Sequence, residues 1–212
     1  MSALDLAAFR STPLVRRPFE YLVVSEFVKP AARAAVHADY PAIASPGSFP
    51  VSELIYGPAF QAFLNTLTGD EFRAAFEEKF DTDLAGRPTV VTVRGRCGPR
   101  DGHIHTDQES KILTVLIYLN RRWDREGGCL RLLRSGTDLE DVVEEIPPRD
   151  GTLVAFRRSD NSWHGHKPFT GERRVVQLNW VTSGRVRRYE VMRHRVSAWV
   201  KKLGASAARM VA

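Results

Sequence analysis

Two pairs of histidines stand out among the residues able to carry out chemistry. His103 and His105 form one pair, and His164 and His166 form the other. Asp107 follows His105 by two positions, and residues two apart in an extended strand share one face. The side chains of His105 and Asp107 can therefore converge on one metal ion, with a later histidine as the third ligand. Two histidines and one carboxylate leave coordination positions open, as non-haem ferrous iron requires.

A second ligand set fits the same part of the chain and changes the predicted reaction class. Its spacing is that of the cupin metal sites, a group that includes isomerases, dioxygenases and binding modules. The members of this set are His103, His105, Glu109 and His164. Cys97 and Leu116 stand where the cupin motif has glycines, which counts against the cupin interpretation. The discriminating observation is whether the metal geometry uses Asp107 or the pair of His103 and Glu109.

The first third of the chain is predicted to be mostly helical. The expected elements are a strand at 21–28 and helices at 30–37, 59–67 and about 68–80. Thr68 and Glu71 have the spacing of a capping box, which would begin the last of these helices. Residues 40–57 contain three prolines and two glycines, so this segment is expected to be irregular and is a candidate flap.

Short β-branched runs follow, separated by turn residues. They lie at 88–93, 112–120, 129–133, 142–146, 152–156 and 173–181. Helices first and strands afterwards indicate an α+β chain, mainly β, with a double-stranded β-helix (jelly roll) core braced by N-terminal helices. Alternation in the last run puts Arg173, Val175, Gln177 and Asn179 on one face, which is too polar for a sealed core and is expected to line a pocket. The other face should pack under the helices and comprises Arg174, Val176, Leu178 and Trp180.

Length and composition indicate one domain. At 212 residues, with 43% hydrophobic and 26% charged residues, the chain has an ordinary globular composition. The expected parts are helical support and flap at 1–86, a jelly-roll catalytic core at 87–182, and a basic amphipathic helix with a tail at 183–212. The apolar runs are too short to cross a membrane and the N-terminus does not resemble a signal peptide, so a cytoplasmic location is expected.

The net charge of +6 is concentrated near the C-terminus. Residues 183–202 hold seven basic residues and one acid, which accounts for the whole excess. Because the rest of the chain is neutral, a nucleic-acid partner is disfavoured, and the basic face is expected to be solvated. An apolar stripe at helical spacing should pack this helix on the domain. Its members are Val186, Tyr189, Met192, Val196, Trp199 and Leu203.

The order of these motifs resembles the iron(II)- and 2-oxoglutarate-dependent oxygenases, and within them the prolyl-hydroxylase-like branch. The matching segments are 102–107 (Gly-His-Ile-His-Thr-Asp), 117–124, 127–132, 150–156 and 163–174. In that family the distal metal histidine lies four residues before a proline and nine before an arginine. His164 satisfies both offsets, to Pro168 and Arg173, whereas His166 does not.

The resemblance implies a site and a reaction. His105, Asp107 and His164 would bind Fe²⁺, and Arg173 would bind the distal carboxylate of 2-oxoglutarate, with Tyr118 on a neighbouring strand as a phenolic donor. A guanidinium presents a planar fork that matches a carboxylate. The family reaction converts 2-oxoglutarate and O₂ to succinate and CO₂ while a substrate, here peptidyl (prolyl) or a small molecule, is hydroxylated.

Four residues are candidates for contact with the substrate. They are Gln177, Asn179, Arg94 and Arg96. For the two arginines a competing interpretation is that they are exposed charges on an edge strand, which guard against aggregation.

Overall fold

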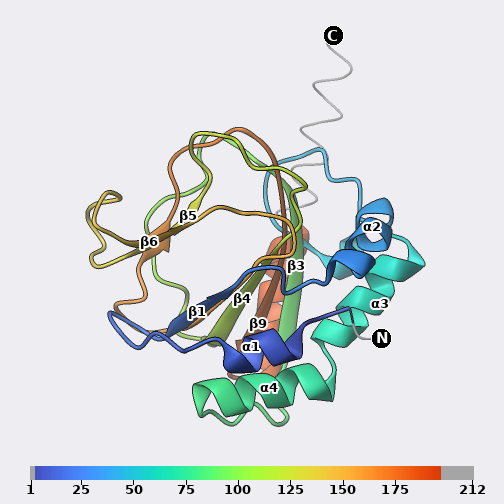
Figure 1. The fold of residues 1–212 in the computed structure, drawn as a ribbon, viewed down its shortest axis with the longest axis horizontal. Helices are drawn as coiled ribbons and strands as arrows, with labels where there is room; N and C mark the ends of the chain where they lie inside the picture. Colours follow the sequence, from blue (N-terminus) through green and yellow to red (C-terminus); the bar gives the residue numbers. More distant parts are fainter. Residues whose placement is uncertain (1–2, 197–212) are drawn as a thin grey trace.

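The structure is a computed structural model that describes residues 3–196. Within this range, antiparallel strands form two sheets, one with the order β1-β7-β4-β9-β3-β2 and one with the order β6-β5-β8. The strands are β1 Tyr21–Val24, β2 Phe49–Pro50, β3 Thr89–Cys97, β4 Lys111–Tyr118, β5 Leu130–Leu133, β6 Val142–Ile146, β7 Leu153–Arg157, β8 His164–Gly165 and β9 Gly171–Val181. Figure 1 shows the smaller sheet facing the larger one, so the expected jelly roll is confirmed.

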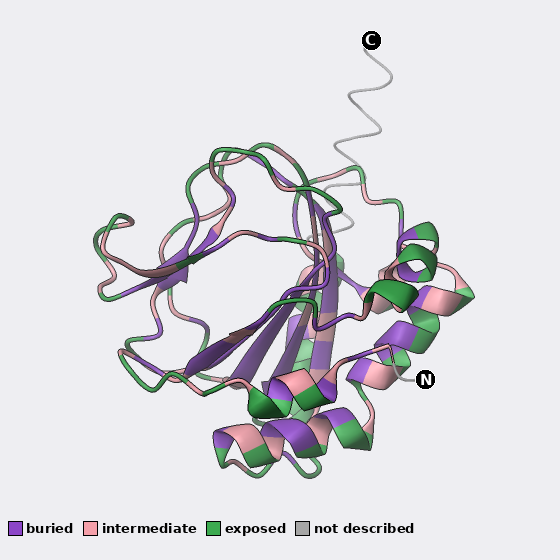
Figure 2. Cartoon of the chain, in the orientation of Figure 1, coloured by how far each residue is buried: buried purple, intermediate pink, exposed green. Residues whose placement is uncertain are grey.

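Helices cover the outer face of the larger sheet (Figure 1). They are α1 Leu6–Ser11, α2 Pro30–Ala38, η1 Val51–Glu53, α3 Pro58–Leu67 and α4 Asp70–Phe80. Phenylalanines of α3 and α4 are buried against the apolar residues of β3, β4 and β9 in one cluster, which appears as the purple interior of Figure 2. Trp180 of β9 lies in this cluster, 5.0 Å from the ring of Phe76 between centroids. The predicted outer face of residues 173–181 is confirmed for Val176, Leu178 and Trp180.

A second apolar cluster lies between the two sheets. It contains Phe19, Tyr21, Leu116, Tyr118, Leu130, Leu132, Ile146, Val154, Phe156 and Val175. All of these residues except Phe19 lie on strands of the two sheets, and together they enclose one polar region. That polar region contains the candidate site.

Two local expectations were wrong in detail. Thr68 does not cap α4, because its hydroxyl donates to the Leu64 carbonyl at 3.1 Å and so belongs to the end of α3. The N-cap of α4 is Gly69, without a side-chain hydrogen bond. Residues 40–57 are not wholly irregular, since they contain β2 and η1. The strand β2 pairs with β3 at the sheet edge, where a proline is tolerated.

The C-terminal helix does not dock through the predicted apolar stripe. Residues 184–196 are helical, but Tyr189, Met192 and Val196 are each more than half exposed. The buried residue is Glu190, and Arg195 forms an ion pair with Glu53 at 2.8 Å. The contact of this helix with the rest of the domain therefore includes an ion pair from a position outside the predicted stripe. Trp199 and Leu203 of the predicted stripe lie outside the described residues.

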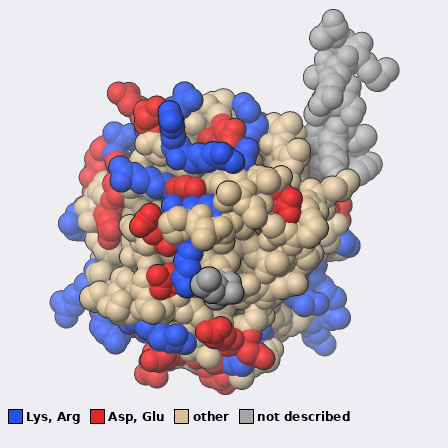
Figure 3. Space-filling view, turned by 45° about the vertical axis from the view of Figure 1, so that its right-hand side comes forward, with Lys and Arg blue, Asp and Glu red and all other residues tan. Residues whose placement is uncertain are grey.

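Charges of both signs are interspersed on the molecular face drawn in Figure 3. Charged residues of the chain form ion pairs with one another, such as Arg131 with Glu140 at 2.9 Å and Arg157 with Glu20 at 2.7 Å. Among residues 3–196 there is no helix whose length and hydropathy would let it cross a bilayer.

Candidate metal centre

Three side chains converge at one end of the larger sheet. His105 and Asp107 lie in the connection between β3 and β4, and His164 begins β8. The backbones of His105 and His164 exchange two hydrogen bonds of 3.0 Å, which places the two imidazoles 4.3 Å apart between centroids. One ligand atom from each of the three residues lies within 4.8 Å of the others. The structure therefore brings together the three residues predicted as iron ligands.

Both imidazoles present a nitrogen to the centre of the group. Nδ1 of His105 lies 2.8 Å from the carbonyl oxygen of His103, and Nδ1 of His164 lies 2.9 Å from that of Ser162. Each Nδ1 must carry the proton to donate to its carbonyl, which leaves the Nε2 lone pair free for a metal. Burial lowers the pKa of His164 to about 4, so its imidazole is neutral at pH 7.

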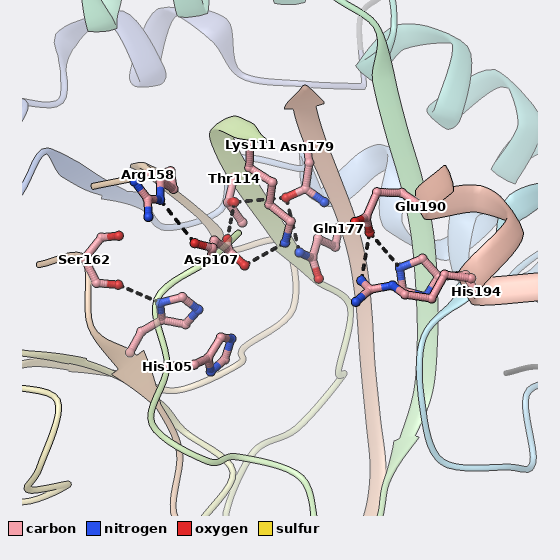
Figure 4. A network of polar contacts seen from close by, with 12 residues as sticks. His105, Asp107, Lys111, Thr114, Arg158, Ser162, Gln177, Asn179, Glu190 and His194 are labelled. Atoms are coloured by element: carbon pink, nitrogen blue, oxygen red, sulfur yellow. Dashed lines mark hydrogen bonds and ion pairs between the residues drawn. The ribbon is translucent and has the colours of Figure 1, made fainter. Parts of the chain in front are cut away.

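The Asp107 carboxylate is ionised and held in place. Burial alone would raise its pKa, but the Lys111 ammonium, His164 and two hydrogen bonds lower the pKa to about 2. Lys111 Nζ lies 2.6 Å from one carboxylate oxygen, and Thr114 Oγ1 donates to the other at 2.5 Å. Figure 4 shows Lys111 and Thr114 pointing at Asp107. A buried carboxylate compensated by a cation, beside two free imidazole nitrogens, is a donor set that fits Fe²⁺.

The rival ligand set is not assembled. His103 and Glu109 are exposed, and within residues 3–196 they belong to no group of side chains able to share an ion. The geometry therefore offers Asp107, and not the pair of His103 and Glu109, as partner to the two histidines.

A cavity of about 150 Å³ adjoins the triad between the two sheets. Its lining residues are Arg94, Gly102, His105, Asp107, Thr114, Leu116, Leu130, Phe156, His164, Gly165, His166, Arg173, Val175 and Gln177. The predicted polar face of residues 173–181 thus lines a pocket at Arg173, Val175 and Gln177. Asn179 is buried beside it, with its side-chain oxygen 2.9 Å from Thr114 Oγ1.

Arg173 is a buried cation at this cavity. Its side chain donates to the Gly128 carbonyl at 2.8 Å and to the Tyr118 hydroxyl at 3.3 Å. In the described part of the chain no carboxylate forms an ion pair with it. Burying a charge without a counter-charge is costly, so the site is suited to an anionic ligand. Tyr118 lies on β4 beside β9, as predicted, but it contacts the guanidinium and is not itself among the cavity-lining residues.

Several residues of the site escaped the sequence analysis. Lys111 and Thr114 follow Asp107 closely in the sequence. The signal that could have identified Thr114 was its place in the strand that follows Asp107, on the face turned toward the cavity. His166 lines the cavity without joining the triad. Burial and then the positive charge of Arg173 lower the pKa of His166 to about 4, so it adds no cation to the cavity. Of the two candidate arginines, Arg94 lines the cavity and Arg96 is exposed.

The comparisons with known proteins agree with this geometry. Residues 95–182 match the family model described as the 2OG-Fe(II) oxygenase superfamily. A search of curated protein sequences gave no match. The family uses Fe²⁺, 2-oxoglutarate and O₂, and the donor set of the triad fits that ion.

Solved structures share the fold at low sequence identity. A prolyl-4-hydroxylase from Pseudomonas putida has a TM-score of 0.54 at 17% identity, over 84% of this chain and 97% of that one. The viral collagen prolyl hydroxylase vCPH from Paramecium Bursaria Chlorella virus-1, in its 2OG complex, has a TM-score of 0.53 at 14% identity, over 76% and 96%. A 2OG-Fe(II) oxygenase family oxidoreductase from Burkholderia pseudomallei has a TM-score of 0.51 at 16% identity, over 84% and 91%. Residues 95–182, which contain the triad, Tyr118 and Arg173, thus match the model of the 2OG-Fe(II) oxygenase superfamily, and the chain shares the fold of these solved structures.

Proposed function

We propose that the chain is a 2-oxoglutarate-dependent dioxygenase that hydroxylates an aliphatic carbon of a peptidyl (prolyl) residue or of a small molecule. The observation that carries the proposal is the convergence of His105, Asp107 and His164 within 4.8 Å. The adjoining cavity is lined by the buried Arg173, for which no ion-pair partner exists among residues 3–196. The bound iron and 2-oxoglutarate would supply the oxidant, with succinate and CO₂ as the other products.

The protein residues have distinct tasks in this proposal. His105, Asp107 and His164 hold Fe²⁺, and the Nδ1 contacts with backbone carbonyls fix the orientation of both imidazoles. Arg173 binds the distal carboxylate of 2-oxoglutarate as a charge-assisted pair, with the Tyr118 hydroxyl beside the guanidinium. Apolar side chains such as Leu116 and Phe156 line the same cavity and limit access of water to the reacting atoms.

The domain organisation is part of the proposal. Residues 87–182 act as the catalytic core, and residues 1–86 support it as part of the same single domain. The apolar cluster shared by the N-terminal helices with β3, β4 and β9 supports this assignment, because neither part has a separate core of comparable size.

The test is formation of succinate by purified protein. The protein is loaded with Fe²⁺ and 2-oxoglutarate without oxygen, and the reaction is started with air. Slow turnover of 2-oxoglutarate to succinate is expected even before a substrate is found, and a substrate is then sought by the gain of one oxygen atom in mass. If the loaded protein yields no succinate, the proposal fails.

Two histidine variants make this test specific. His164→Ala removes a proposed ligand and should abolish succinate formation. His103→Ala is the matched control, because its side chain is exposed and only its backbone carbonyl, which alanine keeps, contacts His105. Loss of turnover in His103→Ala with retention in Asp107→Ala would instead favour the cupin ligand set.

A further inference from the structure

A second arginine faces the cavity from β3. Arg94 lies on the inner face of the larger sheet, with its side chain 21% exposed, and lines the cavity together with Arg173. The register of β3 against β9 shifts here, because two steps from Arg94 to Arg96 face three steps from Val175 to Glu172, which is the signature of a bulge in β9. Arg96, on the far side of this irregularity, is exposed. The strand thus directs one of two closely spaced arginines inward.

The segment at residues 40–57 packs directly on β3 beside this bulge. A Cβ at Gly95 would lie 2.7 Å from the Ile43 side chain and carbonyl, so only glycine admits this close approach. The same segment provides Ser48, whose hydroxyl accepts from Arg94 Nη2 at 3.4 Å. The candidate flap therefore touches the guanidinium that faces the cavity.

The two arginines are close neighbours with like charges. Arg94 is paired with Val175 in the sheet, and Arg173 lies two residues earlier on β9; both arginines line the same cavity. In the proposed enzyme the charges of Fe²⁺, Lys111 and Arg173 already outweigh those of Asp107 and of the two 2-oxoglutarate carboxylates. Arg94 is therefore not needed to neutralise these carboxylates.

The contacts of Arg94 orient it without using all its donors. Nη1 lies 2.8 Å from Asp101 Oδ2, and that same oxygen accepts from the Gly98 amide at 2.8 Å. Nη1 also lies 3.5 Å from the Cys97 sulfur. Arginine has five N–H donors in a fixed fork. Within residues 3–196, its polar contacts involve Nη1 and Nη2 only, so the guanidinium is held by one carboxylate oxygen and retains donors for a ligand.

We infer that Arg94 binds a carboxylate of the primary substrate, so that the enzyme acts on molecules with a free carboxylate rather than on internal residues of a peptide. The inference rests on the proposed function and narrows its substrate class. A guanidinium held on one side and open on the other presents the fork geometry that a carboxylate matches. Asp101 acts as the positioning residue, because it holds Arg94 and does not line the cavity.

The test compares amino acids offered as free acids with the same amino acids as primary carboxamides. Succinate formation above the substrate-free rate and gain of one oxygen are measured for each pair, beginning with L-proline and L-prolinamide. At least one free acid should exceed its amide by about tenfold or more in kcat/KM, because loss of one partner of a desolvated charge pair has effects of that size. A panel in which no acid outperforms its amide overturns the inference.

Three variants separate binding from scaffolding. Arg94→Gln should abolish the preference for acids over amides, whereas Arg96→Gln, with the same loss of charge at an exposed site on the same strand, should retain it. Asp101→Asn removes the charge that positions the guanidinium but leaves the guanidinium in place, so the preference should weaken without being lost. A preference that survives in Arg94→Gln but is lost in Asp101→Asn would show that the ion pair only scaffolds the loop, which overturns the inference.

Two further outcomes are distinguishable. If Arg94→Gln raises the 2-oxoglutarate requirement while the acid preference stays intact, Arg94 belongs to the co-substrate site and the inference is overturned. If the wild-type protein forms no succinate, the proposed function itself fails. Binding of the free acid gives a readout independent of turnover. The acid is titrated without oxygen into protein loaded with Fe²⁺ and 2-oxoglutarate, and its affinity should be lower for Arg94→Gln than for the wild type.

Discussion

The two faces of the larger sheet differ completely although the same strands form both. On the outer face of β9, Trp180 packs against the phenylalanines of α4 in a dry cluster. On the inner face, Arg173 and Gln177 line a cavity beside the triad. Consecutive residues of one strand thus alternate between holding the fold and facing the site. Substitutions on the outer face should therefore change stability, and substitutions on the inner face should change the chemistry of the site.

The largest expected effect comes from the inner face at Asp107. Asp107→Ala should lower iron binding and succinate formation by at least about 100-fold, because the carboxylate is a proposed ligand and even indirect partners of ligands contribute about 10–100-fold. Iron per protein after anaerobic loading and succinate after aeration are the measurements. Retained turnover would show that Asp107 is not an iron ligand.

On the outer face, Trp180→Ala should destabilise the fold by roughly 3–5 kcal/mol, because it removes a large buried aromatic residue and leaves a cavity. Chemical denaturation measures this change. The 2-oxoglutarate requirement of the molecules that remain folded should match that of the wild type. A raised requirement would mean that the two faces are not independent.

Arg173→Ala should raise the 2-oxoglutarate requirement by roughly 30-fold, equivalent to about 2 kcal/mol, since it removes one partner of a desolvated charge pair. The dependence of succinate formation on 2-oxoglutarate concentration measures it. Arg174→Ala is the matched control, because Arg174 is the next residue and its guanidinium lies over the Tyr40 ring instead, 5.1 Å from the centroid. Equal effects in both variants would argue against a specific role for Arg173.

The smallest effect is expected at Thr114. Thr114→Val keeps the shape of the side chain but removes the hydroxyl that donates to Asp107 at 2.5 Å. Iron affinity should fall by roughly tenfold, as for other partners that orient a ligand. Competition with a chelator measures the affinity, and an unchanged value would show that Lys111 alone suffices to orient the carboxylate.

The sequence predicted those features that depend on short-range periodicity. The inward and outward faces of residues 173–181 follow from a period of two, and the strand at Val142–Ile146 was predicted with the observed bounds. The convergence of His105, Asp107 and His164 was predicted from motif order, and their role as iron ligands stays a prediction.

Features that depend on tertiary contacts could not be predicted in this way. The bulge in β9 opposite Arg94 and Arg96 is visible only once β3 is paired with β9. The stripe predicted on the C-terminal helix was wrong for Tyr189, Met192 and Val196, which are exposed, because periodicity does not reveal what a helix meets. Glu190 is buried instead. Lys111 approaches Asp107 only through the path of the connection into β4.

The paired backbones of His105 and His164 join two segments that are far apart in the sequence. With both side chains as ligands, a bound ion would link these two segments. Because the ligands come together only in the folded chain, the ion would bind tightly only to the folded state. Ligands that bind only the folded state add stability by mass action, about 2.7 kcal/mol when the free ligand is at 100 times its Kd. The supply of ferrous iron would then set how long the protein survives heat and proteolysis, as well as how fast it turns over.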